Sequence, residues 1–289
     1  MPPLGSAGPA TRIGALIRLG HPFPSLLDAV VTWALALVAG AMPSRAATLG
    51  VAMFALQVSI GALNDLTDID LDRGRKRGKP IPAGLVGEGT ARVVVAGGLA
   101  VGLGLSAAVG PATLGVAIAG TATGYAYDLR LKATAWAWLP FAIGLPLLPV
   151  YAWVGATGQV PAPFVLLVPL GVLAGAAVAL LNGLVDVERD RAAAVATPAV
   201  RLGPVRARQV AAVLLAGVAT GVVGSLAAIG AAAIAWAISL VGLVSMVIGL
   251  ILVGSSAADR RERGWEAAAV GLALLAAGWA VGFAGQGLL

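Results

Sequence analysis

The sequence contains no cysteine and only one histidine among its 289 residues. The absence of cysteine excludes disulfide bonds, thiolate metal sites and cysteine nucleophiles. Charged residues are also scarce, at 11% of the chain compared with about 25% in typical soluble proteins. A soluble globular fold is therefore not expected, and any metal site would rely on oxygen ligands.

Hydrophobic residues make up 59% of the chain and form long uninterrupted stretches. About 20 apolar residues are needed for a helix to cross a bilayer. Stretches of this kind predict an all-α polytopic membrane protein with about nine transmembrane helices, at residues 24–42, 47–65, 90–109, 112–127, 134–154, 163–185, 207–227, 231–253 and 265–286. The segment before the first span lacks the apolar core of a cleavable signal peptide, so we expect the first span to direct insertion.

Basic residues lie almost entirely on one side of this predicted topology. All lysines and arginines except Arg45 fall in the N-terminal segment or in the loops that follow even-numbered spans. The positive-inside rule then predicts a cytoplasmic N-terminus, cytoplasmic active-site loops and an external C-terminus, in a prokaryotic cell membrane. This position of the basic residues explains the formal charge of +6 without a nucleic acid partner, and membrane lipids are expected to surround the protein.

One polar pattern occurs twice, each time at the end of an even-numbered span. An asparagine and two aspartates recur at intervals of four, as Asn64, Asp68 and Asp72 and as Asn182, Asp186 and Asp190. This spacing places each trio on one helical face in successive turns, and the two trios can face each other across a bundle. Because converging carboxylates repel one another, we expect a cation between them. Oxygen ligands of this kind fit Mg²⁺ better than an all-protein calcium cage.

Two simpler interpretations of the first trio are open. Asp68, Asp70 and Asp72 alternate as in a calcium loop, but the following residues lack the glycine and distal glutamate of such a loop. The aspartates can also form an ordinary solvated helix end. The second, matching trio favours a functional site.

The cations beside the acidic trios indicate a phosphorylated substrate. Four carboxylates and two Mg²⁺ ions cancel in charge, which leaves a diphosphate of about −3 to be neutralised by basic side chains. A metal-bound diphosphate on an apolar chain is a good leaving group. Apolar helices exclude the water that would destroy the resulting carbocation. An isoprenyl diphosphate is therefore the predicted substrate.

At these residues the chain resembles the UbiA superfamily of intramembrane prenyltransferases. The family signatures NDxxDxxxD and DxxxD are similar to Asn64–Asp72 and Asp186–Asp190, and further similar segments are "KPIPAG", "YAYDLRLK" and "TPAVRLG". The resemblance implies one domain over 1–289, with helices around a central cavity, a cytoplasmic cap and two pseudo-related halves at roughly 24–154 and 163–286. Lys79, Ala83 and Pro198 depart from the commoner family residues, so the catalytic part transfers better than the acceptor pocket.

The resemblance also implies roles for individual residues. The catalytic aspartates would be Asp68, Asp72, Asp186 and Asp190, and together with Asn64 they would hold two Mg²⁺ ions. Diphosphate contacts are expected from Asn64, Lys79, Tyr127, Arg130 and Lys132. The cationic segment 73–89 is expected to close over the site when substrate binds.

The predicted function is Mg²⁺-dependent transfer of a prenyl group to a lipophilic or aromatic acceptor. One alternative is a membrane terpene cyclase of the same superfamily, which ionises the same diphosphate without an acceptor. Another is a cation-coupled transporter with acidic sites on repeated helices. Trios at helix ends beside basic loops favour phosphate chemistry. Acceptor, prenyl length, general base and oligomeric state are not specified by the sequence.

Several other polar residues have two interpretations. Asp28 in the first span can line the pocket or reach the membrane surface. His21 is expected to be interfacial, and Tyr125 and Tyr127 can bind diphosphate or lie at the interface. The basic triplet Arg260, Arg261 and Arg263 is expected to be only a topology signal or a contact with lipid head groups.

Overall fold

The structure is a computed structural model that describes residues 9–72 and 78–289. Helices account for 82% of it, and the described part of the chain contains no strand. The long helices are α2 (Pro22–Val38), α3 (Pro43–Thr67), α5 (Glu88–Val109), α6 (Pro111–Ala126), α7 (Leu139–Thr157), α8 (Phe164–Val185), α11 (Pro204–Ala228), α12 (Ala233–Val253) and α13 (Ala258–Gly285). The short ones are α1 (Pro9–Leu19), α4 (Ile69–Asp72), η1 (Tyr127–Leu131), α9 (Val187–Ala192) and α10 (Pro198–Leu202).

Each of the nine predicted spans overlaps one long helix within the described ranges. The all-α, multi-span prediction is thereby confirmed, but the count of nine is approximate. Seven helices are long and apolar enough to cross a membrane, or up to eight if α2 is joined to α1 across a 59° bend. The remaining helix, α6, has 16 residues, fewer than the roughly 20 that a span requires.

Proline and glycine determine where several helices begin and end. Proline stands in the first turn of α3, α6 and α11, where its missing N–H costs no hydrogen bond. The predicted span 134–154 is wrong at its start because α7 begins only at Leu139, directly before Pro140. Helix α7 ends at Thr157, and the next residue, Gly158, has a φ of 79°, which glycine readily adopts.

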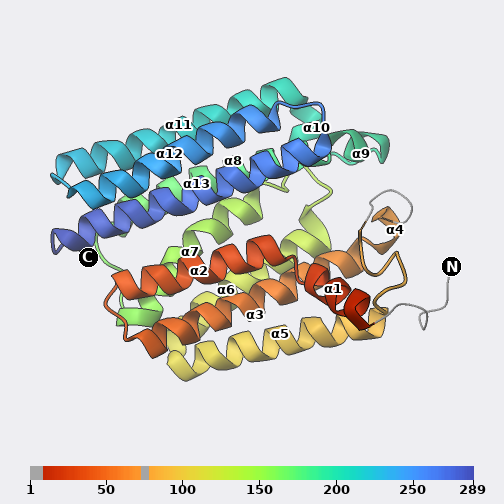
Figure 1. The fold of residues 1–289 in the computed structure, drawn as a ribbon, viewed down its shortest axis with the longest axis horizontal. Helices are drawn as coiled ribbons and strands as arrows, with labels where there is room; N and C mark the ends of the chain where they lie inside the picture. The colour runs from red at the N-terminus through yellow and green to blue at the C-terminus, as the bar shows by residue number, and fades with distance from the viewer. Residues whose placement is uncertain (1–8, 73–77) are drawn as a thin grey trace.

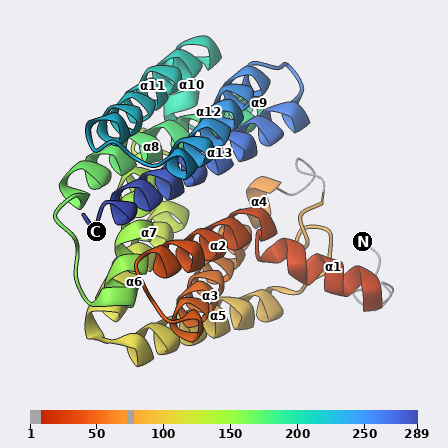
Figure 2. The same ribbon diagram turned by 60° about the vertical axis from the view of Figure 1, so that its left-hand side comes forward.

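The long helices form two groups on either side of α7 and α8, of which α7 packs against α2 and α3 and α8 packs against α11 and α13. Figure 1 shows α11, α12 and α13 together on one side and α2, α3 and α5 on the other, and Figure 2 confirms the separation from a second direction. One apolar cluster joins α8, α11, α12 and α13 through residues such as Leu181, Leu215 and Trp279. A second joins α3 to α7 through Leu49 and Tyr151. A common origin of the two groups stays a prediction.

Helices α12 and α13 pack backbone to backbone. A Cβ atom on Gly249 would lie 2.6 Å from the Gly264 carbonyl oxygen, and one on Gly271 would lie 2.6 Å from the Gly242 oxygen. Small residues of this kind let transmembrane helices approach closely. No side chain larger than hydrogen fits at these crossings.

The short helices α1, α4, α9 and α10 gather at one end of the bundle, and the C-terminal end of α13 lies at the other (Figure 1). The described part of the loop after α4 packs here, where Ile81 and Val86 are buried against Leu19 and Ala62. This apolar contact forms a cap over one end of the bundle. Arg73, Arg75, Lys76 and Arg77, included in the predicted closing segment, lie outside the described residues.

Candidate active site

A cavity of about 1040 Å³ opens between α2, α3, α6, α7, α8 and α13. All five predicted metal ligands line it, namely Asn64, Asp68, Asp72, Asp186 and Asp190. Lys79, Tyr127 and Lys132 line it as well. The structure does not bring Arg130 to the cavity, because this side chain is exposed on the outside of η1.

The two acidic trios form the first motif (Asn64, Asp68 and Asp72) and the second motif (Asn182, Asp186 and Asp190). Each motif lies across a break between a long helix and a short one. Asp68 separates α3 from α4 with φ −100° and ψ 5°, and Asp186 separates α8 from α9 with φ −109° and ψ 17°. The spacing of four suggested that each motif lies on one uninterrupted helix, and the structure shows a break within each motif instead. The turn-by-turn stacking nevertheless persists, because the N–H of Asp72 donates to the Asp68 carbonyl at 2.8 Å and that of Asp190 to the Asp186 carbonyl at 2.9 Å.

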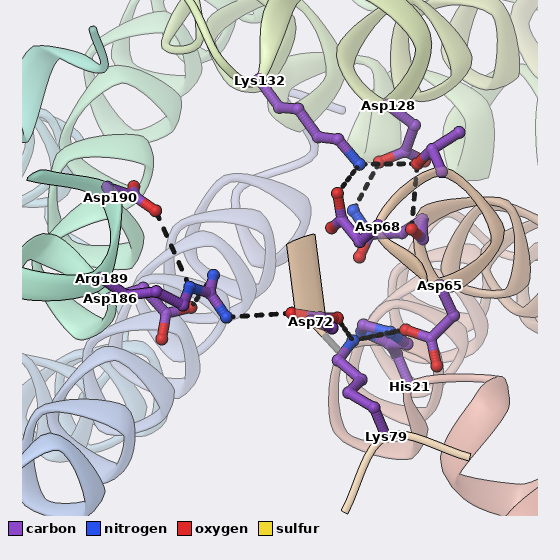
Figure 3. A network of polar contacts seen from close by, with 12 residues as sticks. His21, Asp65, Asp68, Asp72, Lys79, Asp128, Lys132, Asp186, Arg189 and Asp190 are labelled. Carbon is purple, nitrogen blue, oxygen red and sulfur yellow. Dashed lines mark hydrogen bonds and ion pairs between the residues drawn. The ribbon is translucent and has the colours of Figure 1, made fainter. Parts of the chain in front are cut away.

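Arg189 connects the two acidic motifs (Figure 3). Its Nη1 atom lies 3.1 Å from Oδ1 of Asp72, and its Nη2 atom lies 2.8 Å from Oδ2 of Asp186. Its Nε atom is 3.9 Å from Oδ1 of Asp190. One guanidinium thus contacts three of the four predicted catalytic carboxylates, from both motifs.

A second set of contacts surrounds the first residues of the first motif. Lys132 Nζ lies 2.6 Å from Oδ1 of Asp68 and also donates to the Thr67 hydroxyl at 2.6 Å. The Asn64 amide nitrogen donates to Asp128 at 2.7 Å, which leaves the amide oxygen as the atom that can bind a metal. Asp128 follows the end of α6, and its burial raises the pKa of the carboxyl to about 7, against the opposing effects of Asn64 and Lys132.

A third set of contacts links the cap to α3. The carboxyl of Asp65 is 2% exposed and pairs with both Lys79 of the cap and His21, the latter at 2.8 Å. Lys79 Nζ also lies 3.8 Å from Oδ2 of Asp72. Lys79 therefore lies beside the first motif, and its contact with a diphosphate stays a prediction.

The donor set fits Mg²⁺. The candidate ligands are carboxylate and amide oxygens around one cavity, the hard donors that this ion prefers. Within 9–72 and 78–289, no group of three or more histidine, aspartate or glutamate side chains is arranged to hold a metal by itself. The carboxylates instead surround the cations of Arg189 and Lys132. Positive charge is thus already accommodated among these carboxylates, and a metal ion bound by the same oxygens would compete with these two side chains.

Sequence reasoning missed several residues of this site. Arg189 stood between two predicted ligands, and Asp65 stood inside the first signature, but neither was assigned a role. His21 was expected at the membrane interface, whereas the structure places it at the cavity and beside Asp65. Of the two tyrosines, Tyr127 lines the cavity, while Tyr125 bonds the Ser59 hydroxyl at 2.7 Å.

Arg261 differs most from its prediction. It is 5% exposed and donates to the carbonyl oxygen of Val185, the residue before Asp186, at 3.1 Å. It also pairs with Glu188 on α9 and bonds the Ser256 carbonyl at 2.9 Å. The expectation that the whole basic triplet serves only topology is wrong for Arg261, because this arginine joins the start of α13 to the break in the second motif.

Known proteins were compared with the chain at the level of sequence and of fold. A digeranylgeranylglyceryl phosphate synthase from Methanopyrus kandleri is 30% identical over 203 residues, covering 69% of this chain and 73% of that protein. A UbiA homologue from Aeropyrum pernix K1 has the same fold with a TM-score of 0.73, at 19% identity, and covers 88% of this chain and 96% of that one.

An Archaeoglobus fulgidus UbiA homologue bound to DMAPP and Mg²⁺ is also similar in fold, with a TM-score of 0.68 at 19% identity, covering 92% of this chain and 98% of that one. The profile of the UbiA prenyltransferase family matches residues 28–269. This match includes both acidic motifs and most of the helices around the cavity. The chain therefore belongs to the UbiA prenyltransferase family.

Proposed function

We propose that the protein transfers a prenyl group from an isoprenyl diphosphate to a lipophilic acceptor, in a reaction that depends on Mg²⁺. The observation that carries this proposal is the meeting of two acidic motifs, from helices far apart in sequence, in one cavity with cations between them. Binding of DMAPP, GPP and Mg²⁺ by the Archaeoglobus fulgidus homologue supports the same substrate class.

In this proposal Asn64, Asp68, Asp72, Asp186 and Asp190 hold Mg²⁺, and the four carboxylates favour two ions. The bound metal would stabilise the negative charge that develops on the diphosphate as it leaves. Lys79 and Lys132, already at the cavity, move from their carboxylate partners to the diphosphate oxygens. Arg189 would do the same from the second motif. The apolar wall excludes water from the carbocation.

Two similar proteins support a lipid acceptor. Two of the similar proteins are digeranylgeranylglyceryl phosphate synthases, one by sequence and one by fold. We therefore favour a lipid acceptor over a soluble aromatic one. The active-site end of the bundle, which carries the basic loops, is proposed to face the cytoplasm.

Measuring the release of pyrophosphate together with the organic products decides between the candidate functions. Purified protein in lipid nanodiscs is given Mg²⁺ and prenyl diphosphates of several lengths, with and without a lipid acceptor, and pyrophosphate and organic products are measured. A transferase releases pyrophosphate in step with a prenylated acceptor. Release together with a cyclised hydrocarbon, without acceptor, would identify a terpene cyclase instead. A transporter would release no pyrophosphate at all.

A further inference from the structure

A hydrogen-bonded polar pair lies in the apolar part of the cavity. Gln57 of α3 donates through Nε2 to Oδ2 of Asp28 on α2 at 2.6 Å, and both residues line the cavity. No salt bridge joins Asp28 to a cation in the described part of the chain. Insertion of an aspartate into a transmembrane helix is unfavourable, so its presence there points to a function.

The pair lies at a defined depth below the acidic motifs. Gln57 and Asn64 both line the cavity and are seven residues apart on α3, which is about 10 Å along the helix axis. Asp28 is likewise seven residues from His21, whose ring contacts Asp65 at the level of the first motif. A metal-bound diphosphate at the motifs occupies part of that distance. The C1 carbon of its prenyl chain therefore reaches toward the level of Asp28.

The other carboxylates of the cavity are placed differently. Four of them belong to the acidic motifs, and Asp128 accepts a hydrogen bond from Asn64. Glu262 and Glu266 lie in the first turns of α13, at the end that Arg261 joins to Val185. Within the described residues, no hydrogen bond orients the Glu266 carboxyl. Among the described carboxylates of the cavity, only Asp28 combines this depth with a neutral partner that fixes Oδ2, and no hydrogen bond between described residues engages its Oδ1.

From this geometry we propose that Asp28 is the general base for a hydroxyl acceptor, with Gln57 as its positioning residue. This inference rests on the proposed prenyl transfer. The C1–O bond to the diphosphate breaks, and its electron pair leaves with the diphosphate. The acceptor oxygen forms a new bond to C1, and its proton passes to Oδ1 of Asp28. The product is an ether, so the acceptor class is a lipid alcohol.

The test separates transfer from ionisation of the diphosphate. Wild-type protein in nanodiscs receives Mg²⁺, prenyl diphosphates of several lengths and either an alkyl glyceryl phosphate with a free hydroxyl or a hydroxybenzoate. We expect an ether of the alkyl glyceryl phosphate. Asp28→Asn should lower ether formation at least about 100-fold, the usual size of general-base catalysis, while the Kd for prenyl diphosphate with Mg²⁺ changes less than threefold, roughly within the scatter of neutral substitutions.

Gln57→Met keeps the carboxylate and should lower ether formation by a smaller factor. Asp28→Glu should recover part of the activity, and Asp259→Asn, an exposed aspartate at the start of α13, should leave it unchanged. Ether formation at the wild-type rate in Asp28→Asn overturns the proposal, as does its loss in Glu266→Gln alone. Prenylation of aromatic carbon without any ether also overturns it but leaves the prenyltransferase function standing. Absence of pyrophosphate release from wild type would instead refute the proposed function.

Discussion

Arg189 Nη1 lies 3.1 Å from Asp72 Oδ1, although 117 residues separate the two in the sequence. This contact joins α9, the short helix that follows α8, to α4, the short helix that follows α3. Because the same guanidinium also contacts Asp186, it offsets the repulsion between the motifs when no metal is bound. The proposed binding of Mg²⁺ to these carboxylates would therefore compete with Arg189.

Replacing Arg189 with glutamine tests this competition without an activity assay. In the presence of chelator we expect the Tm of Arg189→Gln to fall by about 3–10 °C, because charged hydrogen bonds contribute about 1.5–3 kcal/mol. Added Mg²⁺ should raise the Tm of the variant more than that of wild type, and calorimetry should show tighter Mg²⁺ binding. Weaker Mg²⁺ binding in the variant would contradict the competition.

The metal assignment predicts that chelation abolishes pyrophosphate release. Asp68→Ala and Asp186→Ala should each lower the rate at least about 100-fold, since they remove ligands of the ion that stabilises the leaving group. Their Tm should fall less than that of Arg189→Gln, because each substitution removes one ion pair, with Lys132 or with Arg189, while it relieves repulsion among the remaining carboxylates. Full turnover in excess chelator, or in either folded variant, would exclude these residues as metal ligands.

Lys132 and Arg130 provide a matched pair of cations. Lys132 lines the cavity and pairs with Asp68, whereas Arg130 is exposed outside it. Lys132→Met should raise the KM for prenyl diphosphate roughly 10–100-fold, the effect of removing one charged hydrogen bond. Arg130→Met should change it less than threefold, as is usual for exposed positions. Equal effects of the two substitutions on KM would contradict the assignment of Lys132, rather than Arg130, as the cation that faces the diphosphate.

Arg261 is predicted to position the second motif. Arg261→Ala should raise the Mg²⁺ concentration needed for half-maximal activity about 10–100-fold, as outer-shell substitutions at metal sites typically do. Arg261→Lys should restore part of this affinity. Arg260→Ala, an exposed residue of the same triplet, is the control and should behave as wild type. An identical change in both alanine variants would point to lipid contact or topology instead.

The parts of the structure that depend on local pattern could be predicted from the sequence. Apolar length placed the long helices, and the repeated spacing found Asp68 and Asp186. The helix breaks at these residues were not predictable, because four-residue hydrogen bonds persist across them and the spacing is unchanged. The predicted span 112–127 and the helix α6 (Pro111–Ala126) differ by one residue at each end and both contain 16 residues, so the position of α6 was predicted but its crossing of the whole bilayer was not supported by its length.

Contacts between distant segments could not be predicted from spacing. Arg189 and Asp72 meet only because α8 and α3 end at the same place, and nothing near either residue signals the other. The error at Arg130 has a local cause. Residues two apart on a helical turn do not face the same way, so Lys132 reaches the cavity and Arg130 does not. Both looked equivalent in the sequence because each is basic and follows α6.

The glycine contacts between α12 and α13 also restrict how lipids reach the cavity. The 2.6 Å approach that a Cβ on Gly249 would make to the Gly264 oxygen shows that the two backbones touch without intervening side chains. Where two backbones touch in this way, no side chain can rotate to open a gap for an acyl or prenyl chain. The seam itself is therefore closed to lateral traffic from the bilayer. Of these two helices only α13 lines the cavity in the described part of the chain, so α12 covers the back of α13 and no long-chain substrate passes between them.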